Sequence, residues 1–445
     1  MSTSTPRPDL PDAGDLVVST VGPTTWPSPL NGRGLHFVDD DHGVLCSSDT
    51  RNLAPYFDTE RRPPAFQEAG PRHRLAFDPA GVTAAIVTCG GLCPGLNDVI
   101  RSLTLTLLYG YGVRRVVGYR YGFAGLARPD ESVPLELDAD TVTDVHAYGG
   151  TILGSSRGPQ DPATMVDVLV REGTSVLFCI GGDGTLQGAS SIAAEVRRRR
   201  LRLAVVGIPK TIDNDLDWVE RSFGFATAVE AAARTIVAAH AEARGALYGI
   251  GLVKLMGRHS GFIAANATLA RPDVNLCLIP EVPFTLDGDG GVLDVLAGRL
   301  KQRHHAVVVV AEGAGQELLA PTDETDPSGN ARLADVGTWL RDRLASGLGD
   351  RGIRPEIKYL DPSYEIRALP ANAYDAAFCL SLGQMAAHAG MAGKTDVVVG
   401  YHHRHFTHLP IALVTARRRQ LDPEHDLWQQ VLLSTGQPAH PIGVC

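Results

Sequence analysis

The strongest constraint on the fold is a pattern that repeats from Val82 onward, in which short apolar runs each end in glycine or polar residues. Six such runs are AAIVTCGG, SVLFCIGGDGT, RLAVVGIPKT, ALYGIGLVKLMG, AVVVVAEG and DVVVGY. Their continuous apolar character predicts parallel strands that are buried on both faces. Helix-length stretches such as DVIRSLTLTLL and ATAVEAAARTIVAAHAEA lie between them. This alternation predicts a doubly wound α/β fold, in which ligands bind at the carboxyl ends of the strands.

Charge and hydropathy exclude several broad classes of function. The 445 residues carry a formal net charge of −9, which disfavours sequence-independent binding to nucleic acid or to an anionic membrane. No run of about 18 uncharged apolar residues occurs, so no membrane-spanning helix is expected. The seven cysteines are scattered and odd in number, and the first residues, MSTSTPRPDL, lack a signal pattern. We therefore expect a globular cytoplasmic protein, in which any phosphorylated partner would need a local basic pocket.

Two glycine-rich turns follow predicted strands and open predicted helices. The first, GGLCPGLN, runs from Gly90 to Asn97, and the second, IGGDGT, runs from Ile180 to Thr185. Such turns leave backbone N–H groups and the positive end of a helix available to phosphate oxygens, although a lone glycine turn is as often a packing device. Asp183 in the second turn is placed to hold a Mg²⁺ ion that bridges phosphate oxygens. The alternative interpretation of this turn is an ordinary Asp-Gly turn.

A third motif, PKTIDND, places two carboxylates at the end of another predicted strand. Asp213 and Asp215 are two residues apart in an irregular loop, so one can accept a proton from a hydroxyl while the other faces a metal ion or the surrounding structure. Thr211 offers a hydroxyl and a backbone N–H group to a phosphate. A calcium loop is disfavoured because no glycine and glutamate follow at the spacing of an EF-hand.

These three motifs, in this order, make the chain resemble the phosphofructokinase family. GGDGT alone also occurs in NAD kinases and lipid kinases, whereas the combination of PKTIDND with MGR is specific to phosphofructokinases. The long N-terminal extension and the residues within the motifs resemble those of the plant and trypanosomatid ATP-dependent branch. The resemblance covers about residues 80–415, and its further motifs are GGTILGSSRG at 149–158, KLMGRHSGFIA at 254–264, VAEG at 310–313 and KYLDPSYEIRA at 358–368.

The resemblance also implies an architecture. It predicts two Rossmann-like three-layer α/β/α lobes with the active site in the cleft between them, preceded by an N-terminal extension at residues 1–80. Residues 81–225 with 366–415 would form the donor-binding lobe, and residues 226–365 with 416–445 the sugar-phosphate-binding lobe. The hydrophilic stretch 313–354, with one helical piece, is expected to be a surface insertion or an elaborated connection. A homodimer or homotetramer is the implied assembly.

The activity implied by the resemblance is Mg²⁺-dependent transfer of the ATP γ-phosphoryl group to the 1-hydroxyl of fructose 6-phosphate, with Asp213 as the general base. The implied catalytic residues are Thr211, Asp213, Asp215 and Arg258. The implied donor-site residues are Gly90, Arg157, Gly158, Gly182, Asp183, Gly184, Thr185 and Lys210, with Asp183 also as the metal ligand. The implied sugar-phosphate residues are Thr211, Asp213, Met256, Gly257, Arg258, Glu312, Lys358, Tyr364 and Arg367.

The phosphoryl donor is either ATP or pyrophosphate in this family, and two positions correlate with the choice. Pyrophosphate-dependent members carry Asp at the position of Gly184, where a side chain excludes the rest of a nucleotide, so Gly184 favours ATP. They also carry Lys at the position of Lys210, so this residue favours pyrophosphate as the donor. The plant and trypanosomatid ATP enzymes combine this Gly with this Lys, and steric exclusion is the stronger constraint. ATP is therefore the expected donor.

Other interpretations remain open at this point. A non-catalytic sugar-phosphate sensor would have no need of the base Asp213, and a Rossmann dehydrogenase would need a fingerprint that the chain lacks. Another ketose phosphate, such as sedoheptulose 7-phosphate, is an alternative substrate. Short bacterial enzymes supply an arginine from the neighbouring subunit near the position of Tyr248 or Gly249 in this chain, so that contact must come from elsewhere, such as the neighbour's Lys358. The histidines of YHHRHFTH at 401–408 are expected to be structural.

Overall fold

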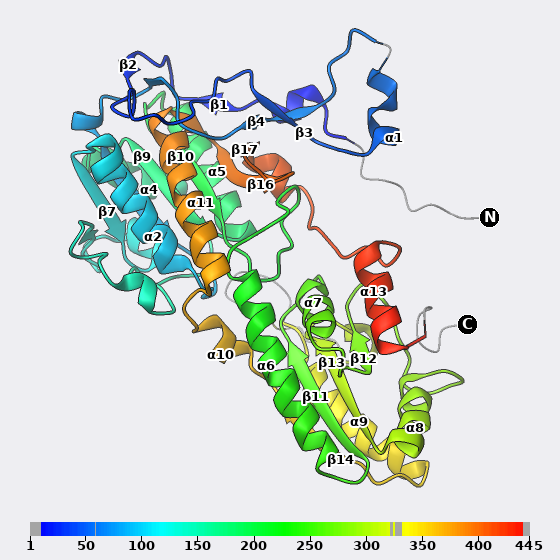
Figure 1. Cartoon of the computed structure of the whole chain (residues 1–445). Coiled ribbons are helices and arrows are strands. Elements are labelled where there is room, and N and C mark those ends of the chain that lie inside the picture. The colour runs from blue at the N-terminus through cyan, green and yellow to red at the C-terminus, as the bar shows by residue number, and fades with distance from the viewer. Residues whose placement is uncertain (1–9, 58, 321–323, 325–331, 439–445) are drawn as a thin grey trace. The chain divides into compact units, whose positions relative to one another are not determined.

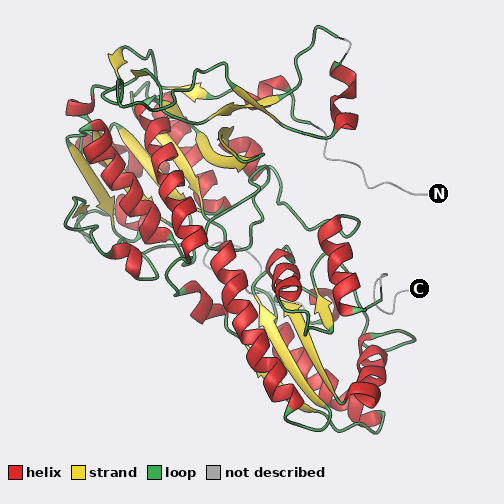
Figure 2. Ribbon diagram, viewed as in Figure 1, coloured by secondary structure: helices red, strands yellow, loops and turns green. Residues whose placement is uncertain are grey.

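The computed structural model describes residues 10–57, 59–320, 324 and 332–438. The chain divides into two units, each assembled from several stretches of sequence. The first unit comprises the residues up to Thr211, Leu216–Phe223 and Ala376–Arg417, and the second comprises Ile212–Asp215, Gly224–Asp375 and the residues from Arg418 onward. Figure 1 follows the chain through both units by colour, and Figure 2 shows that each combines a sheet with helices.

The first unit is built on a nine-stranded sheet with the order β3-β4-β17-β16-β10-β9-β6-β7-β8. Its central strands, from β16 to β7, pair in parallel, while β17, β4, β3 and β8 pair antiparallel. The parallel strands are apolar and buried along almost their whole length, as the sequence predicts. The nine strands are β3 (Gly43–Leu45), β4 (Ala65–Glu68), β6 (Thr83–Thr88), β7 (Arg115–Tyr119), β8 (Leu135–Glu136), β9 (Val176–Gly181), β10 (Ala204–Pro209), β16 (Val397–His402) and β17 (His405–Pro410).

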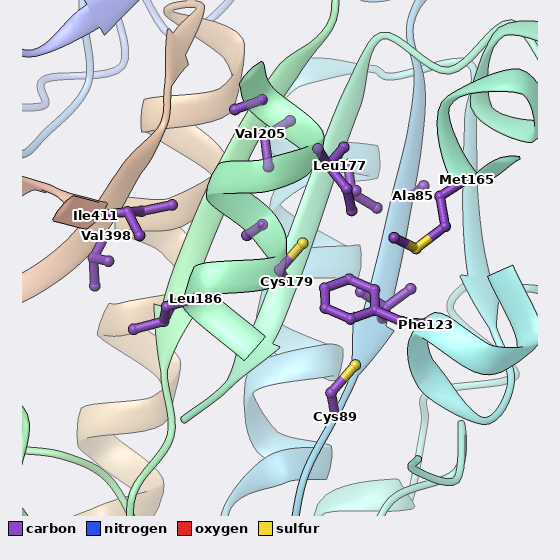
Figure 3. Packing of buried hydrophobic residues seen from close by; sticks show 14 of the residues in the cluster. Ala85, Cys89, Phe123, Met165, Leu177, Cys179, Leu186, Val205, Val398 and Ile411 are labelled. Carbon is purple, nitrogen blue, oxygen red and sulfur yellow. The ribbon is translucent and has the colours of Figure 1, made fainter. Parts of the chain in front are cut away.

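Helices cover both faces of this sheet. On one face, Phe123 and Met165 lie close to the strand residues Ala85 and Leu177, and Leu186 of a third helix lies beside Val398 (Figure 3). On the other face, the Ser102 hydroxyl of α2 donates a hydrogen bond to the Leu380 carbonyl oxygen of α11 at 2.6 Å. The helices of this unit are α1 (Thr50–Leu53), α2 (Leu96–Leu105), α3 (Gly122–Ala127), α4 (Pro162–Arg171), α5 (Asp183–Arg198), most of α11 (Ala373–Met391) and α12 (Ile411–Thr415).

The N-terminal extension belongs to the first unit and adds strands to it. β3 and β4 continue the main sheet beyond β17. Two smaller ribbons pair β1 (Ser19–Thr20) with β15 (Lys394–Thr395) and β2 (Trp26–Pro27) with β5 (Arg74–Leu75). Asp40 lies 2.8 Å from both the Arg72 guanidinium and the Lys394 ammonium, and these two cations hold the pKa of its carboxyl group below the usual value against the opposing effect of burial.

The second unit is a three-layer α/β/α structure around a four-stranded parallel sheet with the order β12-β13-β11-β14. Alternate residues of β11 point to opposite faces, so Val253 and Leu255 pack with α6, α7 and α13, whereas Ile250 and Leu252 pack with α8 and α9. The strands are β11 (Gly249–Leu255), β12 (Leu276–Leu278), β13 (His305–Ala311) and β14 (Glu356–Leu360). The helices are α6 (Phe225–Arg244), α7 (Phe262–Ala270), α8 (Val292–Arg303), α9 (Val336–Asp350), α10 (Ser363–Arg367) and α13 (Asp426–Thr435).

The helical part of residues 313–354 belongs to an elaborated connection between β13 and β14, which is one of the two interpretations given above; the other, a surface insertion, is wrong for this part. The residues Val336, Leu340, Leu344 and Leu348 of α9 are fully buried and form one side of the core around β11 and β13. Their spacing of four residues gives the helix a continuous apolar face within an otherwise hydrophilic stretch. Residues 321–323 and 325–331 of the same stretch lie outside the described residues. Within the described ranges, no helix combines the length and apolarity needed to cross a bilayer.

Candidate functional site

The predicted phosphate-binding motifs of the first unit meet at one edge of its sheet. The parallel register pairs Thr88 at the end of β6 with Ile180 in β9, and Pro209 at the end of β10 with Gly181. The carboxyl ends of these three strands therefore lie side by side. The glycine turn after β6, the GGDGT turn after β9 and the PKTIDND loop after β10 all begin at this edge, as expected for a parallel sheet.

Hydrogen bonds of the two residues before Arg157 hold this segment at the turn after β6. The Gly90 N–H group donates to the Ser156 carbonyl oxygen at 2.9 Å, and the Ser155 hydroxyl donates to the Gly90 carbonyl oxygen at 2.6 Å. A Cβ atom on Gly91 would lie 3.2 Å from the Arg157 guanidinium. Gly90 itself has a φ of +86°, a left-handed conformation that favours glycine. The structure thus places the Arg157 guanidinium beside the glycine turn.

Lys210 is a buried residue of the loop after β10 that contacts both glycine turns. Its ammonium donates to the Gly91 carbonyl oxygen at 2.7 Å, and its backbone N–H group donates to the Gly181 carbonyl oxygen at 2.9 Å. A Cβ atom on Gly182 would lie 3.2 Å from the Lys210 carbonyl oxygen. This contact gives Lys210 a structural role at the edge of the sheet in addition to the positive charge that it supplies there.

The glycines of the GGDGT turn are present for different physical reasons. A Cβ atom on Gly181 would approach the Thr185 hydroxyl to 2.2 Å, so packing of the turn on the first residues of α5 requires glycine there. A Cβ atom on Gly184 would meet no atom within 4 Å. Asp183, the first residue of α5, accepts a hydrogen bond from the Gln187 amide at 3.1 Å. The fold therefore requires a glycine at 181 but leaves space at 184, which lies beside the carboxylate of Asp183.

In the second unit, the MGR segment after β11 packs on the PKTIDND loop. The Arg258 N–H group donates to Oδ2 of Asp213 at 3.5 Å, and the Ser260 hydroxyl donates to the Asp213 carbonyl oxygen at 3.3 Å. Gly257 has a φ of +131°, and a Cβ atom on it would lie 2.5 Å from the Ser260 carbonyl oxygen. The backbone of the MGR segment therefore approaches Asp213 in a conformation that only glycine adopts without strain.

Asp213 has the properties of a general base. Its Oδ1 atom is inaccessible to solvent and has no hydrogen-bond partner among the described residues. Burial, followed by the negative charges of Asp215 and Glu312, raises the pKa of Asp213 to about 7. The Arg258 N–H group and the Arg367 cation act in the opposite direction but are weaker. A carboxylate with a pKa near neutrality and an oxygen that has no hydrogen-bond partner is suited to accept a proton at the pH of the cell.

Two arginines that the sequence analysis did not select contact Asp215, one at its carboxylate and one at its backbone carbonyl oxygen. The Arg418 guanidinium lies 3.2 Å from Oδ2 of Asp215, and the Arg419 N–H group donates to the Asp215 carbonyl oxygen at 2.8 Å. Arg419 also lies over the ring of Phe262, 4.6 Å from its centre. The sequence signal is the run ARRRQ at 416–420, which follows the last strand of the first unit. Asp215 is thus an anchored, buried carboxylate.

Most of the remaining sugar-phosphate candidates lie in the second unit, and Thr211 lies in the first. Glu312 follows β13, and its N–H group donates to the Leu255 carbonyl oxygen at 2.9 Å, which brings it beside the MGR segment. The Arg367 guanidinium donates to the Met256 sulfur at 3.3 Å and lies 5.7 Å from the centre of the Tyr364 ring. Thr211 belongs to the first unit, where the Ser222 hydroxyl donates to its carbonyl oxygen at 2.5 Å.

Lys358 is not brought to this group within its own chain. It pairs with Gly251 in β11, four residues before Leu255, which corresponds to roughly 13 Å along a strand. Its ammonium lies 2.8 Å from the Glu356 carboxylate, and its side chain is 42% exposed. Lys358 is therefore partly exposed and lies at a distance from the carboxyl end of β11.

Comparisons with known proteins agree with this arrangement of motifs. The profile of the family described as Phosphofructokinase matches residues 83–399. The chain is 46% identical to an ATP-dependent 6-phosphofructokinase of Amycolatopsis methanolica, over 96% of this chain and 95% of that protein. An ATP-dependent 6-phosphofructokinase of Trypanosoma cruzi is 49% identical over 82% of this chain and 75% of its own length. The protein named ATP-dependent 6-phosphofructokinase 1 of Arabidopsis thaliana is 44% identical over 93% and 88%.

Solved structures show the same fold at lower sequence identity. The pyrophosphate-dependent phosphofructokinase of Marinobacter aquaeolei is 20% identical, with a TM-score of 0.66, over 80% of this chain and 91% of that chain. At this identity the likeness concerns the fold alone. It confirms the predicted two-lobe α/β architecture.

Proposed function

Because this chain belongs to the phosphofructokinase family, we propose a specific assignment of its residues to the steps of phosphoryl transfer. Its activity is that of an ATP-dependent 6-phosphofructokinase, which transfers the γ-phosphoryl group of ATP to the 1-hydroxyl of fructose 6-phosphate. The products are fructose 1,6-bisphosphate and ADP. ATP is the donor in the relatives that are 44–49% identical, in agreement with the expectation from Gly184.

The observation that carries the assignment is the buried, unpartnered Oδ1 atom of Asp213 in a carboxylate whose pKa is raised to about 7. We assign Asp213 as the group that accepts the proton of the sugar hydroxyl. The hydroxyl oxygen forms a bond to the γ-phosphorus, and the bond from that phosphorus to the bridging oxygen of ADP breaks in the same in-line displacement. Asp215 is a positioning residue, because its negative charge raises the pKa of Asp213 while Arg418 holds it in place.

The donor site is assigned to the first unit. The glycine turns at Gly90, Gly182 and Gly184 would receive the phosphates against backbone N–H groups, and Arg157 would offset charge on the transferred group. The residues fit a Mg²⁺ ion, because Asp183 provides a carboxylate oxygen beside open space at Gly184, and this ion commonly binds one or two carboxylates together with phosphates. When bound, Mg²⁺ would neutralise negative charge on the phosphate oxygens.

The sugar-phosphate site is assigned to the second unit. Arg258 and Arg367 provide positive charge around Met256, and Glu312 can accept hydrogen bonds from sugar hydroxyls. Lys358 lies at a distance from these residues, so we propose that it contacts the sugar phosphate bound by a neighbouring subunit of a homo-oligomer. The cytoplasm is the proposed location, since the six described cysteines are buried thiols that form no disulfides.

A donor assay combined with a base variant tests the core of this assignment. Initial rates with fructose 6-phosphate are measured with ATP and, separately, with pyrophosphate. Asp213→Asn should lower kcat by at least about a hundredfold, given the usual contribution of a general base, while calorimetry shows fructose 6-phosphate binding within a fewfold of wild type. The control is Asp342→Asn, which alters an exposed carboxylate of α9. Turnover close to wild type in Asp213→Asn would contradict the base assignment.

Mixed oligomers test the role of Lys358. Asp213→Asn and Lys358→Ala are each made alone, where both should have low activity, and are then co-expressed with different affinity tags. In a mixed oligomer, the subunit with an intact Asp213 receives Lys358 from its neighbour, so we expect activity to return in part. Mixed oligomers that are as inactive as the separate variants would place Lys358 in the site of its own chain.

A further inference from the structure

The tight turn between β16 and β17 places two adjacent histidines in different environments. His402 ends β16 and pairs with His405 of β17. The turn residues His403 and Arg404 have φ values of +46° and +69°, so the hairpin closes through two left-handed residues. The side chain of His402 is 7% exposed and that of His403 is 29% exposed. Both rings face Glu220, whose own N–H group donates to the Tyr401 carbonyl oxygen at 3.0 Å.

The hydrogen bond at one nitrogen of His402 determines the state of the other. Nε2 lies 3.2 Å from the Cys46 carbonyl oxygen, which can only accept, so Nε2 carries a proton. In the neutral ring, Nδ1 therefore presents a lone pair. This atom is buried and has no hydrogen-bond partner among the described residues, and it lies 3.4 Å from Oε1 of Glu220. Two electron-rich atoms thus face each other, an arrangement that a positive group between them would stabilise.

The distances from the two rings to Glu220 are close to those between the ligands of a tetrahedral metal ion. Bonds of about 2.0–2.1 Å from zinc to nitrogen or oxygen place neighbouring ligand atoms about 3.3 Å apart. Nδ1 of His402 is 3.4 Å from Oε1 of Glu220, and Nε2 of His403 is 3.8 Å from the same oxygen. The ligand atoms of the three residues all lie within 4.8 Å of one another.

The surrounding contacts resemble the support that metal-binding histidines receive in proteins. Such a histidine commonly donates its other N–H group to a backbone carbonyl, as His402 does to Cys46. The other carboxylate oxygen of Glu220 accepts a hydrogen bond from the His403 N–H group at 2.9 Å, which fixes the carboxylate toward the two rings. Phe66 and Trp218 pack edge-on against the ring of His402, at 5.0 and 6.2 Å between ring centres.

We propose that Glu220, His402 and His403 form a binding site for a transition-metal ion of the zinc class, separate from the Mg²⁺ that serves phosphoryl transfer. Two imidazoles and one carboxylate favour Zn²⁺ or Co²⁺ over Mg²⁺, which prefers oxygen ligands. Three protein ligands leave a further coordination position for water. A bound ion would join the β16–β17 hairpin to the loop of residues 216–223, all within the first unit.

Co²⁺ provides a direct probe because its absorption in visible light reports nitrogen ligands. The full chain is stripped of metal with a chelator, dialysed and titrated with Co²⁺ in the presence of excess Mg²⁺. We expect one Co²⁺ per chain to bind with visible absorption bands, and we expect Zn²⁺ to displace it. His403→Ala and Glu220→Gln should each weaken this binding by at least about a hundredfold, which exceeds the usual effect of losing a supporting contact.

The matched control is His405→Ala, which removes an imidazole from the same hairpin. His405 is 53% exposed and lies 3.1 Å from Glu68, outside the proposed set of ligands. This variant should bind Co²⁺ like the wild type and give the same spectrum. The proposal is overturned if the wild type binds no Co²⁺ in excess Mg²⁺, in which case a proton fills the gap at His402. It is also overturned if His403→Ala and Glu220→Gln keep wild-type affinity and absorption.

Discussion

The elevated pKa of Asp213 predicts how activity depends on pH. A general base must be ionised to accept a proton, so kcat/KM should fall as the pH drops through the pKa of about 7. With that value, roughly nine-tenths of the carboxylate is ionised at pH 8 and roughly one-tenth at pH 6, which is a loss of about tenfold. An ordinary aspartate would remain almost fully ionised over this range. The measurement is kcat/KM for fructose 6-phosphate from pH 5.5 to 8.5 at saturating MgATP.

A variant separates the titration of Asp213 from that of the substrate phosphate, whose second pKa lies near 6. The charge of Asp215 is the second largest cause of the shift, after burial. Asp215→Asn removes this charge and should move the half-maximal point to lower pH by roughly half to one unit, whereas the substrate titrates identically in both proteins. The control is Asp217→Asn, which removes a carboxylate paired with Arg417. A wild-type profile that is flat from pH 6 to 8, or an Asp215→Asn profile that superimposes on it, would refute the reasoning.

The same pKa shift has a consequence for stability. The folded state favours the protonated form of Asp213, so the fold loses stability as the pH rises from about 4 through 7. Asp213→Asn cannot ionise and avoids this loss. It should raise the urea midpoint of the protein at pH 8 more than at pH 5, which is the opposite of the pattern for an aspartate stabilised by an ion pair.

The remaining predictions concern one glycine and one buried carboxylate. Gly184→Asp should lower kcat/KM for ATP by at least about tenfold, because the new carboxylate repels the phosphates and fills the space beside them. The control is Gly349→Asp, at another glycine with no atom near its Cβ position, which should leave kcat/KM within about twofold of wild type. Equal values in the two variants would contradict the donor assignment. Asp375 accepts hydrogen bonds from the Thr227 N–H group and hydroxyl at 2.8 and 2.7 Å. Asp375→Ala should therefore cost about 2–3 kcal/mol in urea unfolding, whereas the exposed Asp342→Ala should cost little.

The parts of the fold that could be predicted from sequence are those set by local patterns. The apolar runs from Val82 onward are strands, and the glycines and carboxylates that follow them gather at the carboxyl ends of β6, β9 and β10. This succeeds because a parallel sheet places all such ends at one edge. The order of the motifs also identified the family, which the comparisons confirm. The assignment of individual site residues stays a prediction.

Features created by distant pairing could not be predicted in this way. β3 has three residues and no periodicity, and it exists because β4 binds it and is itself paired with β17. The pairing of Asp215 with Arg418 joins positions 203 residues apart. The pKa of Asp213 depends on its burial, which the local sequence does not record. The apolar face of α9 and the arginine run at 416–420 are local signals from which a correct prediction was possible.

The position of β4 beside β17 has a consequence for synthesis of the chain. His405, where β17 begins, lies 337 positions after Glu68, where β4 ends. At about 5–20 residues per second, a ribosome needs roughly 17–70 s to make the intervening chain. Throughout that interval the β3–β4 hairpin lacks the neighbour on which it will pack, and an unpaired strand edge readily joins other chains. We therefore expect the outer edge of β4 to stay without its partner strand in the nascent chain until β17 has been made.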